Sequence, residues 1–299
     1  MLLRASGTWG RASALLFCTV IIARTVISAS TLAPAQPSPA RRIVSLVPAV
    51  TEMLFAVGAG PQMVGVSSFD REPPEVDRLP RVGALLDPDL ERILSLRPDL
   101  VVVYDSQDEL KSQLARAGTP VFPYRHGGVA GITETIRRVG RRTGHAETAD
   151  RLVREIGAAL EAVRTRASGR ARPRTLLVLG RDPDTLRNVF VSGGVGFLHE
   201  LLEAAGGANV FEETRREGVQ VSVEQILAKR PEVILELRAE GDARDDPHAL
   251  GAWESLSSVP AVRNGRVHVM HGSELVVPGP RIARAAERFA RTLHPDLER

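Results

Sequence analysis

The sequence predicts an α/β protein with two similar Rossmann-like lobes, each with a mainly parallel sheet, joined by one long rigid helix and enclosing a ligand cleft. Two observations predict this class. The segment 91–103 recurs as 224–236, and each copy has a short amphipathic stretch, an Arg-Pro break and an apolar run. A long helical pattern at 145–168 separates the two copies. Because repeated alternation of helices and strands is typical of parallel sheets, the body is expected to contain two α/β units.

Residues 1–40 are predicted to be a signal peptide and a linker. Arg4 and Arg11 precede an apolar run at 14–23, and small and proline-rich residues follow. This order is typical of a cleaved secretory signal peptide, and the run is shorter than the roughly 20 residues that span a bilayer. We therefore expect a periplasmic protein, with a retained membrane anchor as the alternative. Cleavage removes Cys18, the single cysteine, so no disulfide is expected.

The N-terminal α/β lobe is expected at 41–130. It opens with a strand at 43–47 and a helix at 51–60 that ends in glycine. The segment 91–97 has the spacing of a short amphipathic helix, which a proline ends. The apolar run 100–103 has the composition of a buried parallel strand.

Connecting helices are expected at 131–170. The stretch 145–168 has no proline, and its apolar residues follow helical spacing, so it predicts a continuous helix about 36 Å long. Gly169 and Pro173 end the pattern. Because this helix separates the two repeated segments, we interpret it as a rigid strut between the lobes. A helix packed on one lobe alone is the alternative.

The C-terminal α/β lobe is expected at 171–299. A strand at 175–179, a helix at 196–207 and the second copy of the repeat give it the same order of elements as the first lobe. The glycine-rich segment 192–196 lacks the third glycine of a dinucleotide-binding loop. We therefore interpret it as a tight turn between a strand and a helix.

Charge and motifs exclude several classes of function. Residues 1–40 hold three arginines and no acid, so the rest of the chain has equal numbers of basic and acidic side chains. A neutral body gives no electrostatic reason to expect a nucleic-acid partner. The sequence has no hydrolase, phosphate-loop or zinc-enzyme motif, and His268 and His271 are expected on opposite faces of an extended segment. We predict neither catalysis nor a metal site; an exported α/β enzyme is the alternative from another class.

Several motifs occur in order along the body. They include 42–58, Asp-Leu-Glu-Arg-Ile at 89–93, Gly-Gly-Ala-Asn-Val-Phe at 206–211 and Gly-Pro-Arg-Ile at 279–282. Over 41–295 the chain resembles the iron/cobalamin periplasmic-binding family. The resemblance implies a monomeric receptor, with no cofactor of its own, that delivers a small-molecule metal chelate to an ABC permease in the inner membrane. Within the family the cobalamin receptors look nearest, and haem or a ferric siderophore is the alternative ligand.

The resemblance also implies ligand-facing residues. Aromatic positions of the family fall on Phe69, Tyr104 and Phe190, and Leu85 stands where the family has a further aromatic. Flat aromatic faces suit a large apolar macrocycle because they bury much area with little loss of side-chain freedom. Ordinary core packing is the alternative for the three aromatic residues.

Arg125 and His126 follow a strand at the end of the first lobe, where the cleft is expected to open. We expect them to face the ligand, because imidazole binds metals and a guanidinium binds carboxylate or phosphate. A role in an exposed loop is the alternative.

Docking to the permease, in the family that the chain resembles, uses a surface glutamate on each lobe. Glu91 matches the first position, and Glu274 is the candidate for the second. Exposed charges of this kind guide association and orientation. Glu224, the repeat mate of Glu91, is interpreted as a carboxylate that stabilises a helix N-terminus.

Overall fold

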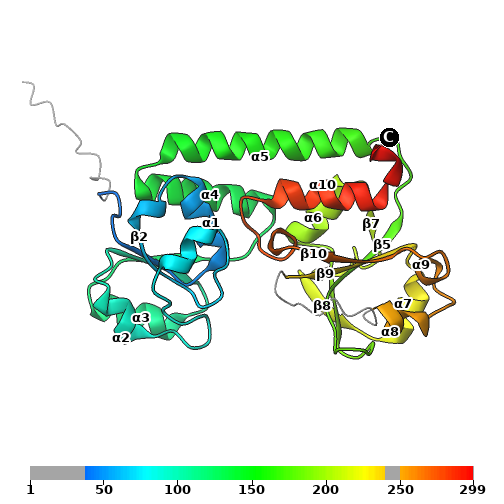
Figure 1. Cartoon of the computed structure of the whole chain (residues 1–299), viewed down its shortest axis with the longest axis horizontal. Coiled ribbons are helices and arrows are strands. Elements are labelled where there is room, and N and C mark those ends of the chain that lie inside the picture. The colour runs from blue at the N-terminus through cyan, green and yellow to red at the C-terminus, as the bar shows by residue number, and fades with distance from the viewer. Residues whose placement is uncertain (1–37, 240–249, 299) are drawn as a thin grey trace, which may run out of the picture. The chain divides into compact units, whose positions relative to one another are not determined.

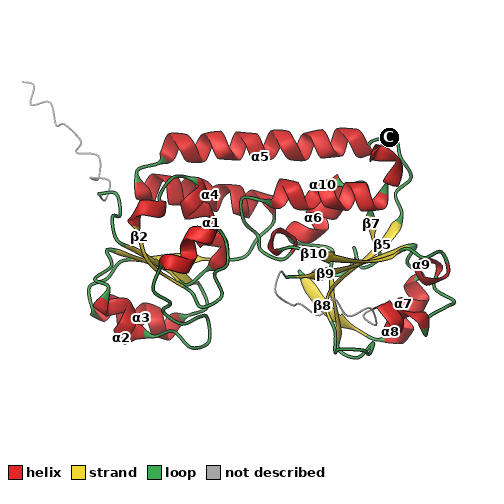
Figure 2. Cartoon of the chain, viewed as in Figure 1, coloured by secondary structure: helices red, strands yellow, loops and turns green. Residues whose placement is uncertain are grey.

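Helices and strands alternate along the chain as the sequence predicts (Figure 1, Figure 2). The computed structural model describes residues 38–239 and 250–298. The predicted signal peptide and almost all of its linker lie outside these residues. Within the described ranges, no helix is long and apolar enough to cross a membrane.

The N-terminal lobe has a fully parallel four-stranded sheet in the order β2-β1-β3-β4. Its strands are short and apolar because helices cover both faces of the sheet. Residues of α1 and α4 pack on one face, and residues of α2 and α3 pack on the other. The elements are β1 (Ile43–Ser45), α1 (Pro48–Ala56), β2 (Met63–Val66), α2 (Leu90–Ser95), β3 (Leu100–Tyr104), α3 (Asp108–Arg116), β4 (Val121–Tyr124) and α4 (Val129–Thr143).

The C-terminal lobe has a six-stranded sheet of mixed direction. Strands β10, β9, β5 and β7 pair in parallel. Strand β6 pairs antiparallel with β5 on one side and with β8 on the other. The segment 181–188 between β5 and β6 is too short for a crossover helix, so the chain returns as a hairpin. The elements are β5 (Arg174–Gly180), β6 (Val189–Ser192), α6 (Phe197–Ala204), β7 (Ala208–Asn209), β8 (Gly218–Val221), α7 (Val223–Lys229), β9 (Val233–Arg238), α8 (Gly251–Glu254), α9 (Pro260–Arg263), β10 (Val267–His271) and α10 (Ile282–Leu293).

One 22-residue helix, α5 (Ala146–Ala167), joins the lobes. It packs against α4 of the N-terminal lobe and against α6 and α10 of the C-terminal lobe, and it runs alongside both (Figure 1). Five of its six buried residues belong to a single apolar cluster that includes strand residues of both sheets, such as Val102 and Leu235. The predicted connecting helix is therefore confirmed, and the two lobes share one core.

The sequence repeat is also a structural repeat. α2 leads into β3 as α7 leads into β9, and Ile93 and Ile226 are each fully buried in clusters on the sheet face away from α5. Arg97 and Arg230, which both precede a proline, have positive φ angles of 48° and 49°. Both helices are therefore followed by a residue in the same left-handed backbone conformation, and the proline that comes next cannot continue the helix.

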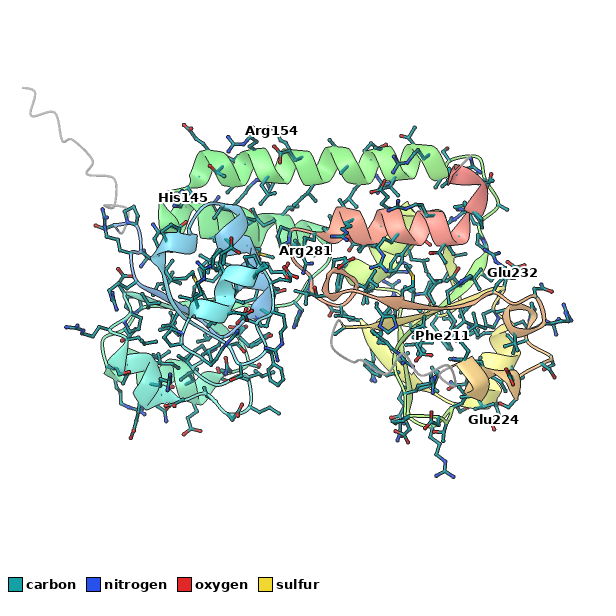
Figure 3. All side chains as sticks on the ribbon, in the orientation of Figure 1. His145, Arg154, Phe211, Glu224, Glu232 and Arg281 are labelled. Carbon is teal, nitrogen blue, oxygen red and sulfur yellow. The ribbon has the colours of Figure 1, made fainter. Side chains whose placement is uncertain are left out.

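Two polar contacts add to the shared core in holding the lobes together. Arg281, just before α10, donates from Nε and Nη2 to the carboxylate of Glu52 in α1 at 3.0 and 2.7 Å (Figure 3). Glu52 is buried, and a buried carboxylate is costly without such a partner. The backbone N–H of Val129 donates to Glu200 at 2.8 Å, so a side chain of the C-terminal lobe caps α4.

Candidate functional site

Three rings gather at the carboxyl edge of the parallel sheet. β3 ends in Tyr104 and β4 ends in Tyr124, and the two are register partners with ring centroids 6.1 Å apart. The His126 ring lies 5.8 Å from Tyr104 and 5.2 Å from Tyr124. Burial raises the pKa of both tyrosine hydroxyls, so both remain protonated. Parallel sheets commonly bind ligands at this edge, so the cluster marks a candidate binding site.

A cavity of about 350 Å³ lies where this edge faces the C-terminal lobe. His126 lines it from the N-terminal lobe, and Glu217 lines it from the C-terminal lobe. The other side chains on its wall are apolar: Leu179, Phe190, Val195, Phe197, Leu198, Val276 and Pro278. Apolar walls with a few polar groups are the usual form of a small-molecule site.

Phe190 lies on the wall of this cavity. Its side chain is 44% exposed, whereas Val189 and Val191 on the opposite face of β6 are buried. The ring lies over Gly218, where an added Cβ would come within 2.5 Å of Cζ of Phe190. The core-packing alternative for Phe190 is therefore wrong, and the absence of a side chain at Gly218 leaves room for the ring.

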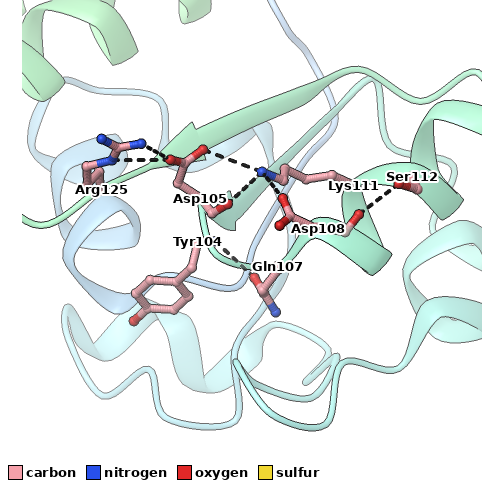
Figure 4. A network of polar contacts seen from close by, with 7 residues as sticks. All are labelled: Tyr104, Asp105, Gln107, Asp108, Lys111, Ser112 and Arg125. Carbon is pink, nitrogen blue, oxygen red and sulfur yellow. Dashed lines mark hydrogen bonds and ion pairs between the residues drawn. The ribbon is translucent and has the colours of Figure 1, made fainter.

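A second hollow of about 290 Å³ shares His126 with the first and also includes Tyr104, Asp105, Ser106, Tyr124 and Arg125. Ion pairs hold Arg125 at this hollow (Figure 4). Its Nε and Nη2 donate to Oδ2 of Asp105, and Nζ of Lys111 donates to the backbone oxygen of Asp105. The hydrogen bond from Arg125 lowers the pKa of Asp105, so both groups of the pair stay charged. Arg125 is thus positioned with much of its charge already balanced.

Phe69 is at the same edge of the sheet, after β2, and 69% of it is exposed. The core-packing alternative is therefore wrong for this residue too. The turn that carries it is fixed by Asp70, whose Oδ2 accepts the Ser67 N–H at 2.7 Å. Phe69 lines neither of the two hollows, so the structure leaves it beside the site.

Leu85 is 41% exposed and also lines neither hollow. Gln107 links it to the end of β3, because its Nε2 donates to the Leu85 carbonyl at 3.0 Å while its Oε1 accepts the Tyr104 N–H at 2.9 Å. Of the predicted ligand-facing residues, the structure gathers Tyr104, Phe190, Arg125 and His126, and leaves Phe69 and Leu85 outside the two hollows.

Several lining residues were missed by sequence reasoning. Phe197 is the first residue of α6, directly after the glycine-rich turn in which Gly196 has a φ of +89°. The turn was predicted, so the neighbouring apolar residues Val195 and Phe197 could have been assigned to the cleft. Glu217 had no such signal, because nothing in the local pattern predicted the antiparallel strand β8 that follows it.

The two predicted docking glutamates have different environments. Glu91 is exposed in the first turn of α2. Glu274 is only 3% exposed, and Arg288 binds its carboxylate at 2.7 Å. A buried, paired carboxylate does not fit the predicted surface docking role, so Glu274 is corrected to a structural residue.

Glu224 occupies in α7 the place that Glu91 has in α2, as the second residue of the helix (Figure 3). It is exposed, and a hydrogen bond with Ser222 lowers the pKa of its carboxyl. Asp89 and Ser222 cap the two helices in the same way, each accepting a backbone N–H three residues later. The exposed glutamate is therefore part of the structural repeat.

Residues 38–239 and 250–298 contain no group of three or more His, Cys, Asp or Glu side chains that could hold a metal ion. His126 is a single imidazole, and a bare ion needs several protein ligands.

Comparison with known proteins identifies relatives with this architecture. A vitamin B12-binding protein of Salmonella typhimurium is 32% identical over 225 residues, which cover 75% of this chain and 81% of that protein. The solved structure of the periplasmic vitamin B12 binding protein of Vibrio cholerae shares 26% identity and a TM-score of 0.73, covering 87% of this chain and 99% of that one. A periplasmic heme-binding protein from Roseiflexus sp. RS-1 shares 26% identity and a TM-score of 0.71, covering 86% and 99%.

A family model described as periplasmic binding protein matches residues 43–274. The match spans both sheets, the connecting helix α5 and the residues from Tyr104 to Gly218 that line the two hollows. The fold, the cleft and the sequence relatives agree, and the chain belongs to the periplasmic binding protein family.

Proposed function

We propose that this protein is the substrate-binding component of an ABC importer. In this proposal it captures cobalamin or a related corrinoid in the periplasm and delivers it, by binding alone, to the permease in the inner membrane. One observation carries the proposal: an aromatic and apolar cleft occurs in a chain whose relatives include proteins named as vitamin B12-binding.

The walls of the cleft suit the flat face of a corrin ring. Phe190 and Phe197 present apolar surface from the C-terminal lobe, while Tyr104 and His126 present rings from the N-terminal lobe. Aromatic side chains bury a large area at a low cost in side-chain entropy. Because the lobes share one core, the walls are held in place before the ligand arrives, which reduces the free-energy cost of ordering the site.

Glu217 favours a ligand rich in amides over an acidic one. Its carboxylate lines the cavity and forms no ion pair within the described part of the chain. Its negative charge contributes to the raised pKa of Tyr124, which belongs to the other lobe. The edge of a corrin ring carries amide N–H donors that suit a carboxylate, whereas the propionates of haem meet a like charge.

Haem is the second candidate ligand. The heme-binding relative is as similar in sequence as the Vibrio cholerae vitamin B12 binding protein, at 26% identity. Arg125 is also 82% exposed, and its guanidinium is a suitable partner for a propionate. Its pairing with Asp105 reduces this attraction, which is why we favour the corrinoid.

Titration calorimetry with cyanocobalamin tests the proposal. We expect one ligand per chain. We expect Phe190→Ala to weaken binding roughly tenfold, because loss of one ring contact costs on the order of 1.4 kcal/mol. Leu227→Ala is a matched control, since Leu227 is an exposed apolar residue of α7 that does not line the cleft, and it should leave the affinity unchanged.

Haemin and a ferric siderophore in the same titration separate the alternatives. Tight binding of either ligand without any heat from cyanocobalamin would assign that ligand instead. If none of the three binds, the receptor proposal is wrong.

For delivery we propose that Glu91 and Glu224 are the two docking carboxylates. Both are exposed second residues of the equivalent helices α2 and α7. Both helices lie on the side of their lobes opposite to α5 (Figure 1). An exposed carboxylate on each lobe can orient the receptor on a basic surface.

A further inference from the structure

His126 lines both hollows of the cleft and is exposed in the loop between β4 and α4. This loop is anchored at its far end by the hydrogen bond from the Val129 N–H to Glu200. An added Cβ at Gly128 would lie 1.8 Å from Oε1 of Glu200, so the carboxylate of Glu200 packs directly against the backbone of Gly128. His126 therefore stands on a fixed support, as a ligand-binding side chain requires.

The imidazole ring is oriented by the two tyrosines. It packs edge-on against Tyr124 at an interplanar angle of 76° and lies tilted at 37° to Tyr104. Nδ1 is 3.5 Å from the Tyr124 hydroxyl, and Nε2 has no hydrogen-bond partner among the described residues. When Nδ1 carries the proton, it donates to the hydroxyl oxygen and leaves the lone pair of Nε2 available. Metal-bound imidazoles use this arrangement, with the second nitrogen donating a hydrogen bond.

We infer that Nε2 of His126 is an axial ligand for the metal of the captured macrocycle. The inference rests on the proposed function and defines its ligand class: a planar cobalt or iron macrocycle with an exchangeable axial water. The Nε2 lone pair forms a bond to Co(III) or Fe(III), the metal–water bond breaks, and water leaves as a neutral molecule. The oxidation state and the number of protons do not change.

The surroundings of His126 support this chemistry. The macrocycle supplies four donors in its plane, so one imidazole suffices to complete the coordination on one face. Phe190, Phe197 and Leu179 on the same cavity wall exclude the water that competes for the metal. Coordination would make the receptor select its ligand by two properties: the shape of the macrocycle and whether the axial ligand on the metal can be exchanged.

Absorption spectroscopy of the purified protein with aquocobalamin and cyanocobalamin tests the inference. We expect the visible bands of aquocobalamin to shift on binding, because an imidazole nitrogen replaces the axial water. Cyanocobalamin keeps its cyanide, so it should bind without this shift and on the order of tenfold more weakly.

Three variants assign the shift to the proposed atoms. His126→Gln should abolish the aquocobalamin shift and the preference over cyanocobalamin, so that aquocobalamin binding weakens by more than cyanocobalamin binding. Tyr124→Phe keeps the ring but removes the acceptor for Nδ1–H, and should weaken aquocobalamin binding about tenfold. His145→Gln is the control, because His145 lies at the start of α5 outside the cleft (Figure 3), and it should change neither ligand.

The outcomes separate this inference from the proposed function. Aquocobalamin that binds without a shift, or with a shift that survives His126→Gln, overturns the axial-ligand role and leaves the corrinoid receptor standing. Failure of both corrinoids to bind overturns the corrinoid function. A Soret shift of haemin that depends on His126 supports the same coordination with iron as the metal.

Discussion

Asp70 is a buried carboxyl behind the exposed ring of Phe69. Its Oδ2 accepts the Ser67 N–H at 2.7 Å. Burial raises the pKa of Asp70 from 3.8 to about 7, and the nearby carboxylate of Glu52 adds to this rise while Arg81 opposes it. The folded protein therefore holds this proton more tightly than the unfolded chain does.

This single residue predicts a pH dependence of stability. The raised pKa means that the folded state binds more protons than the unfolded state between pH 3.8 and about 7, so Asp70 lowers the free energy of unfolding as the pH rises through this window. The loss is on the order of 1.4 kcal/mol per pKa unit. The asparagine of Asp70→Asn stays neutral at every pH. The melting temperature of the variant, relative to that of the wild type, should therefore rise from pH 4.5 to pH 7.5. A difference in melting temperature that stays constant over this pH range would contradict the assignment.

At the scale of elements, α5 contains one weak position, and its packing against α4 is tight at another. Gly157 is exposed in the middle of this helix, and an added Cβ would meet no atom within 4 Å. Gly140 of α4 faces α5, and an added Cβ would come within 2.3 Å of Cβ of Ala149. The same substitution should therefore act in opposite directions at the two glycines.

Gly157→Ala should stabilise the protein by about 0.5–1 kcal/mol, because alanine loses less backbone entropy in a helix. Thermal unfolding should show a rise in melting temperature of about 1–4 °C. Gly140→Ala is the matched contrast and should lower the melting temperature, because the two helices must move apart. A lower melting temperature for Gly157→Ala would show that the position is more confined than the structure indicates.

The local sequence pattern predicted the helices and strands better than it predicted how the strands pair. The 145–168 helix follows from unbroken helical spacing and was found as α5, and the repeat located α2, β3, α7 and β9. Strand direction has no such local signature, so the antiparallel pairing of β6 with β5 and with β8 was missed. The site followed the same division. His126 was predicted from its place after a strand and Tyr104 from the family resemblance, whereas Glu217 depends on long-range pairing.

For the whole molecule, the duplicated architecture places one exposed glutamate on each lobe. Charge reversal of both, Glu91→Arg with Glu224→Arg, should leave cyanocobalamin affinity unchanged, because neither residue lines the cleft. It should abolish stimulation of ATP hydrolysis by the importer of the same organism in liposomes, because like charges then face the permease.

Glu147→Arg is the control for this experiment, since Glu147 is an exposed residue in the first turn of α5 on the opposite side of the molecule. Full stimulation by the double variant would place the docking surface elsewhere. Loss of stimulation by the control would point to a general effect of charge.

The position of Trp253 determines how ligand binding can be followed by fluorescence. Its side chain is 1% exposed, and its Nε1 donates to Glu236 at 3.0 Å within the cluster on the face of the C-terminal sheet away from α5. Trp9 lies in the predicted signal peptide, so Trp253 is the indole that remains after cleavage. A bound ligand that absorbs light can quench Trp253 only by resonance energy transfer, because the indole does not contact it. The fluorescence intensity should therefore fall on ligand binding while the emission wavelength stays constant.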